Sequence, residues 1–178
     1  PRHRFGMDLR HPRRIEVLAH LRKQRRDVLH ARGGRIEPLR QWRERVMFLR
    51  RAEGDEWPDL SDAALMASIG GWLGPLLGSK TALGDITQDE LATAVHALLP
   101  WSLRKRLDAE APTHFAAPSG SQVPIDYGEE GPKLSIRVQE LFGLGRHPAV
   151  AGGRVPLLVE LLSPAHRPVQ VTRDLPGF

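Results

Sequence analysis

The segment of this chain that comes closest to a cofactor-binding motif is Gly78-Ser79-Lys80-Thr81. A phosphate-binding loop has a glycine, four further residues and then Gly-Lys followed by Ser or Thr, so that backbone amides and the lysine surround the phosphates. In this chain a serine separates Gly78 from Lys80, and no strand pattern precedes the segment. The spacing therefore argues against an ATP site here.

Glycine pairs occur twice more, at Gly143-x-Gly145 and at Gly152-Gly153. A dinucleotide-binding turn needs a third glycine and a long helix after it. Both pairs lack these features, so loop glycines are the favoured interpretation. Arg154 follows the second pair directly, and we keep it as a candidate contact to a phosphate.

The histidines and hydroxyl residues do not form a catalytic or metal-binding pattern. Eight histidines are scattered along the chain without metal-ligand spacing on one predicted face. His114 lies near Ser119 and Asp126, but a hydrolase triad also needs a nucleophile turn and an oxyanion hole, and neither is indicated. We therefore predict no catalytic residue and no metal site.

Basic residues give the strongest functional signal. Residues 1–51 contain 16 Lys and Arg against 5 Asp and Glu, whereas residues 52–178 contain 10 against 16. Basic clusters lie at 22–26, at 40–51 and at Arg104-Lys105-Arg106. Such clusters contact phosphates with little dependence on sequence, and so they indicate a polyanion or an acidic partner. The alternative interpretation is a solvated, Arg-rich helical surface.

Aromatic residues could add base stacking to such a surface. The four tryptophans lie in helical stripes or at helix junctions, where core packing is favoured over stacking; they are Trp42, Trp57, Trp72 and Trp101. Tyr127 and Phe115, on predicted strands, are better stacking candidates if the β part is an oligonucleotide-binding barrel. Core packing is the alternative for these two residues as well.

Composition limits the class of protein. Cysteine is absent, which excludes disulfides, Cys-based zinc sites and thiol nucleophiles. No apolar run approaches the roughly 20 residues of a membrane helix, and the N-terminus lacks the apolar region of a signal peptide. We expect a soluble, cytoplasmic protein without a membrane partner. Because the sequence starts at Pro1 without Met, we also expect it to be part of a longer chain.

Helical spacing dominates the chain up to residue 111. The clearest helix, 38–51, has an apolar stripe that consists of Leu39, Trp42, Val46 and Leu49. Ser61 is a predicted N-cap for a helix that Pro75 ends. Thr87 and Glu90 are predicted to form a capping box. Basic helices are also predicted at Arg13–Arg32 and at Trp101–Ala109, the latter with Leu103 and Leu107 on its buried side.

The stretch Pro112–Tyr127 marks the change from helix to strand. Phe115 leads into a turn around Gly120, and the residues that follow alternate between apolar and polar or proline positions. Alternation indicates half-buried strands, since successive side chains point to opposite faces. Further strands are predicted at 134–138, 155–162 and 169–173, the second of them central with both faces covered, while 137–144 is either strand or short helix.

The predicted fold class is therefore α+β. A helical N-terminal part precedes a small antiparallel β unit of about five strands, for which a closed, oligonucleotide-binding-fold-like barrel and an open sheet are both compatible with the pattern. Three regions are predicted: a basic helical extension (1–35), a helical accessory region (36–111) and a small β-rich domain (112–178).

Four segments in order resemble the C-terminal region of the bacterial ATP-dependent helicase HrpB. They are Pro112–Tyr127, Lys133–Gly143, Gly153–Pro164 and Arg167–Leu175. The resemblance extends into the helical part through Trp42–Arg51, Glu56-Trp57-Pro58 and Leu99-Pro100-Trp101. Residues 1–35 do not resemble this family, and their basic character departs from it.

The resemblance implies a non-motor part of a DEAH-type helicase, whose RecA-like motor lobes carry the ATPase motifs and use ATP and Mg²⁺. No cofactor is expected in this region itself, and no catalytic residue can be transferred to it. An accessory role in holding single-stranded RNA or DNA is implied. The proposed contact residues are Arg104, Lys105, Arg137, Arg154, Arg167, Arg173 and Tyr127. The alternative is a docking or regulatory module that packs on the motor lobes of the same polypeptide.

Overall fold

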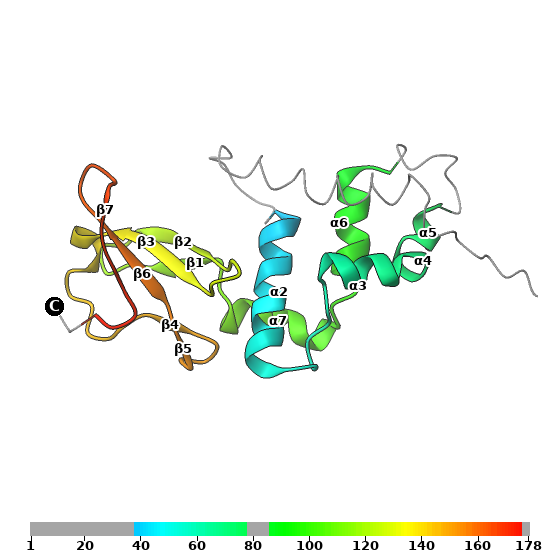
Figure 1. The fold of residues 1–178 in the computed structure, drawn as a ribbon, viewed down its shortest axis with the longest axis horizontal. Helices are drawn as coiled ribbons and strands as arrows, with labels where there is room; N and C mark the ends of the chain where they lie inside the picture. Colours follow the sequence, from blue (N-terminus) through cyan, green and yellow to red (C-terminus); the bar gives the residue numbers. More distant parts are fainter. Residues whose placement is uncertain (1–37, 78–85, 176–178) are drawn as a thin grey trace, which may run out of the picture. The chain divides into compact units, whose positions relative to one another are not determined.

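The computed structural model describes residues 38–77 and 86–175, with helices followed by strands along the chain (Figure 1). The described residues fall into two compact units, one containing 38–42 and most of 60–98, the other containing 43–59 and 99–175. The predicted helix at Arg13–Arg32 and the segment Gly78–Thr81 lie outside the described residues. The predicted division at residues 35 and 111 stays a prediction.

Helix α2 spans Leu39–Glu53 and begins directly after Pro38. Proline suits this position because its fixed φ is helical and its missing N–H would have no intrahelical partner. All four residues of the predicted apolar stripe are buried, which confirms the periodicity. Arg45 belongs to the predicted basic cluster 40–51, but it is not part of a solvated surface, since the structure leaves only 1% of it exposed.

The first unit is built mainly from short helices: α3 (Asp62–Ala67), α4 (Ile69–Trp72), α5 (Gly74–Leu77) and α6 (Gln88–His96). Ser61 caps α3 as predicted, because its side chain accepts a hydrogen bond from the Ala64 N–H. The capping box of α6 is confirmed, with Thr87 and Glu90 satisfying each other's backbone N–H groups at 2.9 and 3.2 Å. The single helix predicted after Ser61 is instead interrupted at Ser68 and Leu73.

Helix α7 spans Trp101–Glu110 and belongs to the second unit. Leu103 and Leu107 are buried as predicted, since they lie four residues apart on one side of the helix. Their burial leaves the opposite side of α7 facing solvent.

The second unit contains a five-stranded sheet with the order β1-β2-β3-β6-β7. Its strands are β1 (His114–Ala116), β2 (Gln122–Asp126), β3 (Lys133–Arg137), β6 (Leu158–Leu162) and β7 (Pro168–Thr172). The turn between β1 and β2 contains Gly120 with φ of 90°, a conformation that glycine adopts without steric cost. The stretch Pro112–Tyr127 thus forms the predicted pair of strands.

Within the five-stranded sheet, three of the four pairings are antiparallel, and β3 pairs with β6 in parallel. Parallel neighbours need a crossover connection, and here the chain between them forms a 3-10 helix, η2 (Val138–Leu141), and a separate hairpin of β4 (Ala149–Val150) and β5 (Val155–Pro156). The α+β fold is confirmed, with a mixed sheet. Because β1 and β7 lie at its two edges, the described sheet is open and is not a closed barrel.

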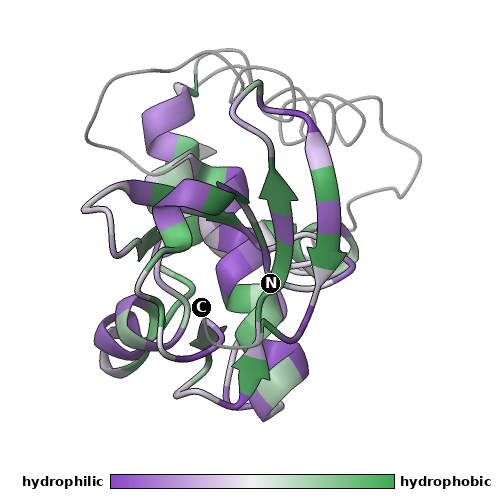
Figure 2. Cartoon of the chain, turned by 90° about the vertical axis from the view of Figure 1, so that its left-hand side faces the viewer, coloured by the Kyte–Doolittle hydropathy of each residue, from purple (hydrophilic) through white to green (hydrophobic). Residues whose placement is uncertain are grey.

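Hydrophobic and hydrophilic residues alternate along the strands, as the bands in Figure 2 show. One face of the sheet is buried and carries Ile125, Leu134, Ile136, Val159 and Leu161. The other face carries Ser135, whose hydroxyl donates to the Glu160 carboxylate at 2.6 Å. The predicted strand 155–162 is divided at Leu157. Its last part, β6, lies between β3 and β7 and has one face buried rather than two.

Within the described ranges, no helix is both long and apolar enough to cross a bilayer. The same residues contain no group of three or more His, Cys, Asp or Glu side chains arranged to hold a metal ion.

Candidate nucleic-acid interface and the network beside it

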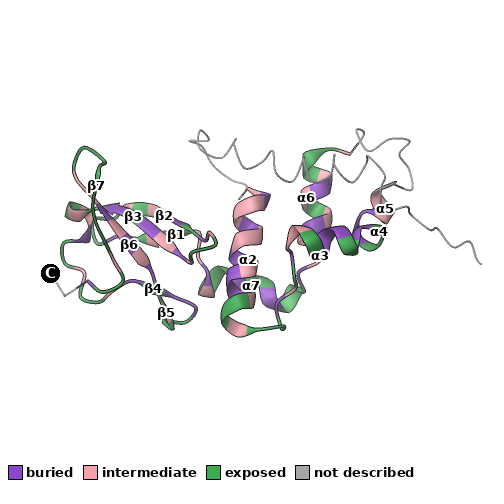
Figure 3. Ribbon diagram, viewed as in Figure 1, coloured by how far each residue is buried: buried purple, intermediate pink, exposed green. Residues whose placement is uncertain are grey.

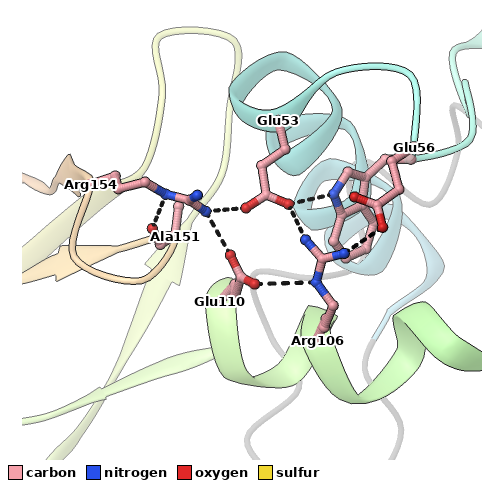
Figure 4. A network of polar contacts seen from close by, with 7 residues as sticks. Glu53, Glu56, Arg106, Glu110, Ala151 and Arg154 are labelled. Atoms are coloured by element: carbon pink, nitrogen blue, oxygen red, sulfur yellow. Dashed lines mark hydrogen bonds and ion pairs between the residues drawn. The ribbon is translucent and has the colours of Figure 1, made fainter.

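A network of charged side chains joins three segments of the second unit (Figure 4). Glu53, at the end of α2, accepts hydrogen bonds from the Trp57 indole at 2.7 Å and from Arg106 at 2.8 Å, and it also pairs with Arg154. Arg106 binds Glu56 at 2.6 Å, and Glu110 binds Arg154 at 2.8 Å. We call these residues the Glu53 network.

The Glu53 network keeps its central carboxylate ionised. Burial by itself raises the pKa of Glu53, but hydrogen bonds involving the side chains of Glu110, Trp57 and Arg154, together with the charge of Arg106, outweigh it. The pKa of Glu53 therefore lies below its ordinary value of 4.5. Opposite charges and donors at this distance favour the charged form of an acid.

The Arg154 side chain is bound within the Glu53 network. Its Nε donates to the Ala151 carbonyl at 2.7 Å, and its Nη2 binds both Glu53 and Glu110. The Ala151 N–H in turn donates to the Glu110 carbonyl at 2.6 Å, so the β4–β5 turn is held against the end of α7. The assignment of Arg154 to phosphate stays a prediction, and this side chain already has two carboxylate partners.

The buried side chain of Arg45 caps the C-terminal end of α7. Its guanidinium donates to the carbonyls of Ala111 and Leu107, the latter at 3.2 Å, and it binds the Asp108 carboxylate at 2.8 Å. The last carbonyls of a helix lack intrahelical donors. A planar, always-charged guanidinium can serve several of them at once, so a surface arginine in the sequence pattern becomes a buried helix cap.

The outer side of α7 carries an aromatic ring beside two cations. Trp101 is 76% exposed, and the guanidinium carbon of Arg104 lies 5.2 Å from the centre of its ring. Lys105 is also exposed and lies one turn after Trp101 on the same side. We call Trp101, Arg104 and Lys105 the α7 surface. It brings together two of the predicted basic residues with a tryptophan for which core packing had been favoured.

Helical spacing alone could have identified Trp101 as exposed. Successive residues of a helix are rotated by about 100°, so Trp101 lies about 200° from Leu103, which forms the buried side. The prediction that Trp101 packs in the core rested on the general preference of tryptophan for the core and not on this angle.

The remaining predicted contact residues lie apart from the α7 surface. Arg137, at the end of β3, binds Glu140 at 2.7 Å. Arg167 and Arg173 are exposed and lie at the two ends of β7. Tyr127 is buried, packs on Phe48 with 5.2 Å between ring centres, and donates its hydroxyl to the Pro112 carbonyl at 2.8 Å. Its ring has no free face for base stacking, and we omit it from the proposed surface.

A pocket of about 300 Å³ opens between the C-terminal part of α2, the β2–β3 turn and β5. It is lined by Phe48, Arg51, Ala52, Glu129, Glu130, Gly131, Pro132, Val155, Pro156, Leu158 and Arg173. Its two arginines and two glutamates balance each other in charge. The pocket therefore shows no preference for an anionic or a cationic ligand.

Comparison with known proteins places these features in a family context. Residues 72–178 match the family model described as ATP-dependent helicase C-terminal, HrpB_C. The chain is 43% identical over 124 residues to the ATP-dependent RNA helicase HrpB of Escherichia coli, an alignment that covers 69% of this chain and 15% of that protein.

Two solved structures agree with this match. The crystal structure of the E. coli DExH-box NTPase HrpB aligns with a TM-score of 0.68 and 40% identity, covering 76% of this chain and 17% of that one. The crystal structure of the E. coli DEAH/RHA helicase HrpB aligns with a TM-score of 0.64 and 39% identity over the same shares. The chain thus spans about 15% of the length of the curated relative that it matches. The family match covers more than half of the chain, and the chain belongs to the family of HrpB-type ATP-dependent helicase C-terminal regions.

Proposed function

We propose that this chain is a non-motor region of an ATP-dependent helicase and binds single-stranded nucleic acid through the α7 surface. The observation that carries the proposal is a tryptophan with 76% of its surface exposed, on one side of a helix with two cations. Large apolar rings are costly to expose. An exposed ring next to cations is a common device for binding single strands without regard to sequence.

Each residue of the α7 surface has a distinct role in this proposal. A base stacks on the free face of the Trp101 ring, and stacking of this kind contributes about 1–3 kcal/mol per base. Arg104, held beside the ring, and Lys105, one residue later, contact the phosphates that flank the stacked base. Asp108 shares this side of α7, but its charge is compensated by Arg45 at 2.8 Å.

The role is accessory rather than catalytic. The phosphate-loop-like segment Gly78–Thr81 departs from the spacing that a phosphate-binding loop requires. ATP and Mg²⁺ would be bound by the motor lobes of the longer protein. The name of the E. coli relative, an RNA helicase, favours RNA as the strand that is held.

Equilibrium titration of the purified chain with labelled single-stranded RNA and DNA tests the proposal. Trp101→Ala should weaken binding by about 1–3 kcal/mol, since one stacking platform is lost. Phe142→Ala is the matched control, because Phe142 is also a large exposed aromatic residue, with 61% exposed, and it lies outside α7. Equal losses for the two variants, or no binding by the parent chain at low salt, would refute the assignment.

A second candidate function is docking on the motor lobes of the same polypeptide. The exposed ring of Phe142, at the end of η2, favours it, because isolated aromatic residues of this size often mark protein contacts. In that case Phe142→Ala would weaken association with separately expressed motor lobes and leave oligonucleotide affinity unchanged.

A further inference from the structure

The edge strand β7 is largely exposed. Among the described strands it pairs with β6 alone, and four of its five residues are exposed (Figure 3). Proline opens the strand at Pro168, as is common at sheet edges. The backbone groups that point away from β6 pair with no other described strand, and a further strand can add there.

Two valines on β7 form an apolar pair that the sheet itself does not cover. Val169 is 66% exposed and Val171 is 52% exposed. Val171 is the register partner of Glu160, which places it on the outer face together with Ser135. Gln170 pairs with Leu161 and Pro168 with Leu162, so Val169 is the extra residue at an irregularity of the register, where it is exposed next to Pro168.

Arginines bracket this apolar pair. Arg167 directly precedes β7 and Arg173 directly follows it, and both are exposed. Five strand residues separate them, so the two arginines lie six residue steps apart, roughly 20 Å for an extended chain. The edge therefore presents a cation, two valines and a second cation in sequence, beside a row of backbone donors and acceptors that no described strand pairs with.

We infer that β7 is a docking edge for an extended segment of a partner protein, one that carries an apolar pair with an acidic residue at each end. The segment adds to the sheet beside β7, so that its backbone completes the ladder and its apolar side chains cover Val169 and Val171. Its carboxylates then lie near Arg167 and Arg173. This inference goes beyond the proposed nucleic-acid function and does not depend on it.

Other occupants fit the edge less well. In antiparallel pairing between two copies of β7, the Arg167 end of one strand lies beside the Arg173 end of the other, and the like charges repel each other. A nucleic acid strand would find no aromatic residue on β7 for stacking. Charge and composition thus both favour an acidic, extended peptide.

A designed peptide tests the inference directly. The probe has seven residues, with aspartate at both ends, valine at the third and fifth positions and threonine elsewhere, and its affinity for the purified 178-residue chain is measured by fluorescence anisotropy. A second peptide has lysine in place of both aspartates. The aspartate peptide should bind at least about tenfold more tightly at low salt, and the difference should shrink as salt screens the charges.

Two further arms make the result specific to β7. Arg167→Glu combined with Arg173→Glu should invert the preference toward the lysine peptide, with the thermal unfolding midpoint of the chain as the check on folding. N-methylation of alternate backbone nitrogens of the aspartate peptide should abolish binding for one alternate set and spare it for the other, because only one set faces β7.

The inference is overturned if the two peptides bind equally, if neither binds up to millimolar concentration, or if the charge-reversed variant keeps the parent's preference. Concentration-dependent dimers in sedimentation experiments that Val171→Lys abolishes would identify a second copy as the occupant instead. Displacement of the peptide by single-stranded RNA in the Trp101→Ala variant would assign the edge to nucleic acid.

Discussion

Replacement of Arg45 by methionine should destabilise the second unit by about 2–3 kcal/mol. Methionine keeps much of the buried aliphatic volume but removes all donors, so the Ala111 carbonyl loses its guanidinium partner. An unsatisfied buried carbonyl costs about 1–3 kcal/mol. The Leu107 carbonyl loses less, since it still accepts a hydrogen bond from the Ala111 N–H at 2.9 Å. Asp108 is 80% exposed in its side chain and regains water when its partner is removed.

Two companion variants separate helix capping from ion pairing. Arg45→Lys keeps the charge, but a single ammonium cannot reproduce the planar fork that reaches two carbonyls and a carboxylate. We expect it to destabilise the unit about as much as methionine does. Asp108→Ala removes only the exposed member of the pair and leaves both carbonyl hydrogen bonds of Arg45 in place, so we expect it to cost less than Arg45→Met.

Urea unfolding of the 178-residue chain, followed by circular dichroism, measures these differences through the transition midpoint and slope. The slope must be compared among variants, because two units can unfold separately. If Arg45→Met stays within about 0.5 kcal/mol of the parent, or if Asp108→Ala costs as much as Arg45→Met, the capping explanation is wrong.

Further outcomes follow from the Glu53 network, from Glu160 and from a bridging histidine. The pKa of Glu53 is lowered as described above, and the pKa of Glu160 is lowered by hydrogen bonds from Ser135 and Lys133 against the effect of burial. The two lowered pKa values stabilise the folded chain fully above the ordinary pKa of 4.5. This stabilisation is lost as pH falls toward the pKa values of the folded state, because the unfolded chain takes up protons first. Urea midpoints should therefore fall between pH 6 and pH 3, and less steeply in Glu53→Gln; an unchanged pH dependence in that variant would contradict this. His147 accepts a hydrogen bond from the Leu175 N–H at 3.1 Å and its other ring nitrogen lies 2.8 Å from the Leu157 carbonyl, so His147→Phe should cost about 1–3 kcal/mol in the same unfolding assay and raise amide exchange at Leu175. Protection of Leu175 unchanged by that substitution would show that the histidine does not hold this segment.

Local patterns in the sequence predicted the elements that depend on near neighbours. The stripe of α2, the Ser61 cap and the capping box of Thr87 and Glu90 all rest on spacings of three or four residues, and the structure confirms each of them. The turn at Gly120 and the strands beside it follow from alternation and backbone freedom in the same way.

Features that depend on distant partners were not visible in the sequence. Arg45 acquires its role only when α7 ends beside it, 66 residues later. Arg154 binds the carboxylates of Glu110 and Glu53, which lie 44 and 101 residues away in the sequence. The parallel pairing of β3 with β6 likewise depends on where the intervening hairpin folds, and no periodicity records that choice.

The candidate site was predicted in part. Arg104 and Lys105 were identified from their cluster, whereas the exposed tryptophan beside them was assigned to the core on the general preference of its residue type. The sheet is open at β7 because of its strand order. The sequence pattern did not decide between a closed barrel and an open sheet.

The salt dependence of single-stranded RNA binding tests the proposed function most directly. On a single strand, each neutralised phosphate contributes about −0.7 to the slope of log affinity against log salt concentration. Arg104→Ala combined with Lys105→Ala should therefore make the slope shallower by about 1.4, whereas Trp101→Ala should weaken binding at every salt concentration and leave the slope unchanged. Arg146→Ala, which removes an exposed cation outside α7, should keep the parent's slope. A double variant with the parent's slope, or an equal change in the Arg146 control, would contradict the assignment of the α7 surface.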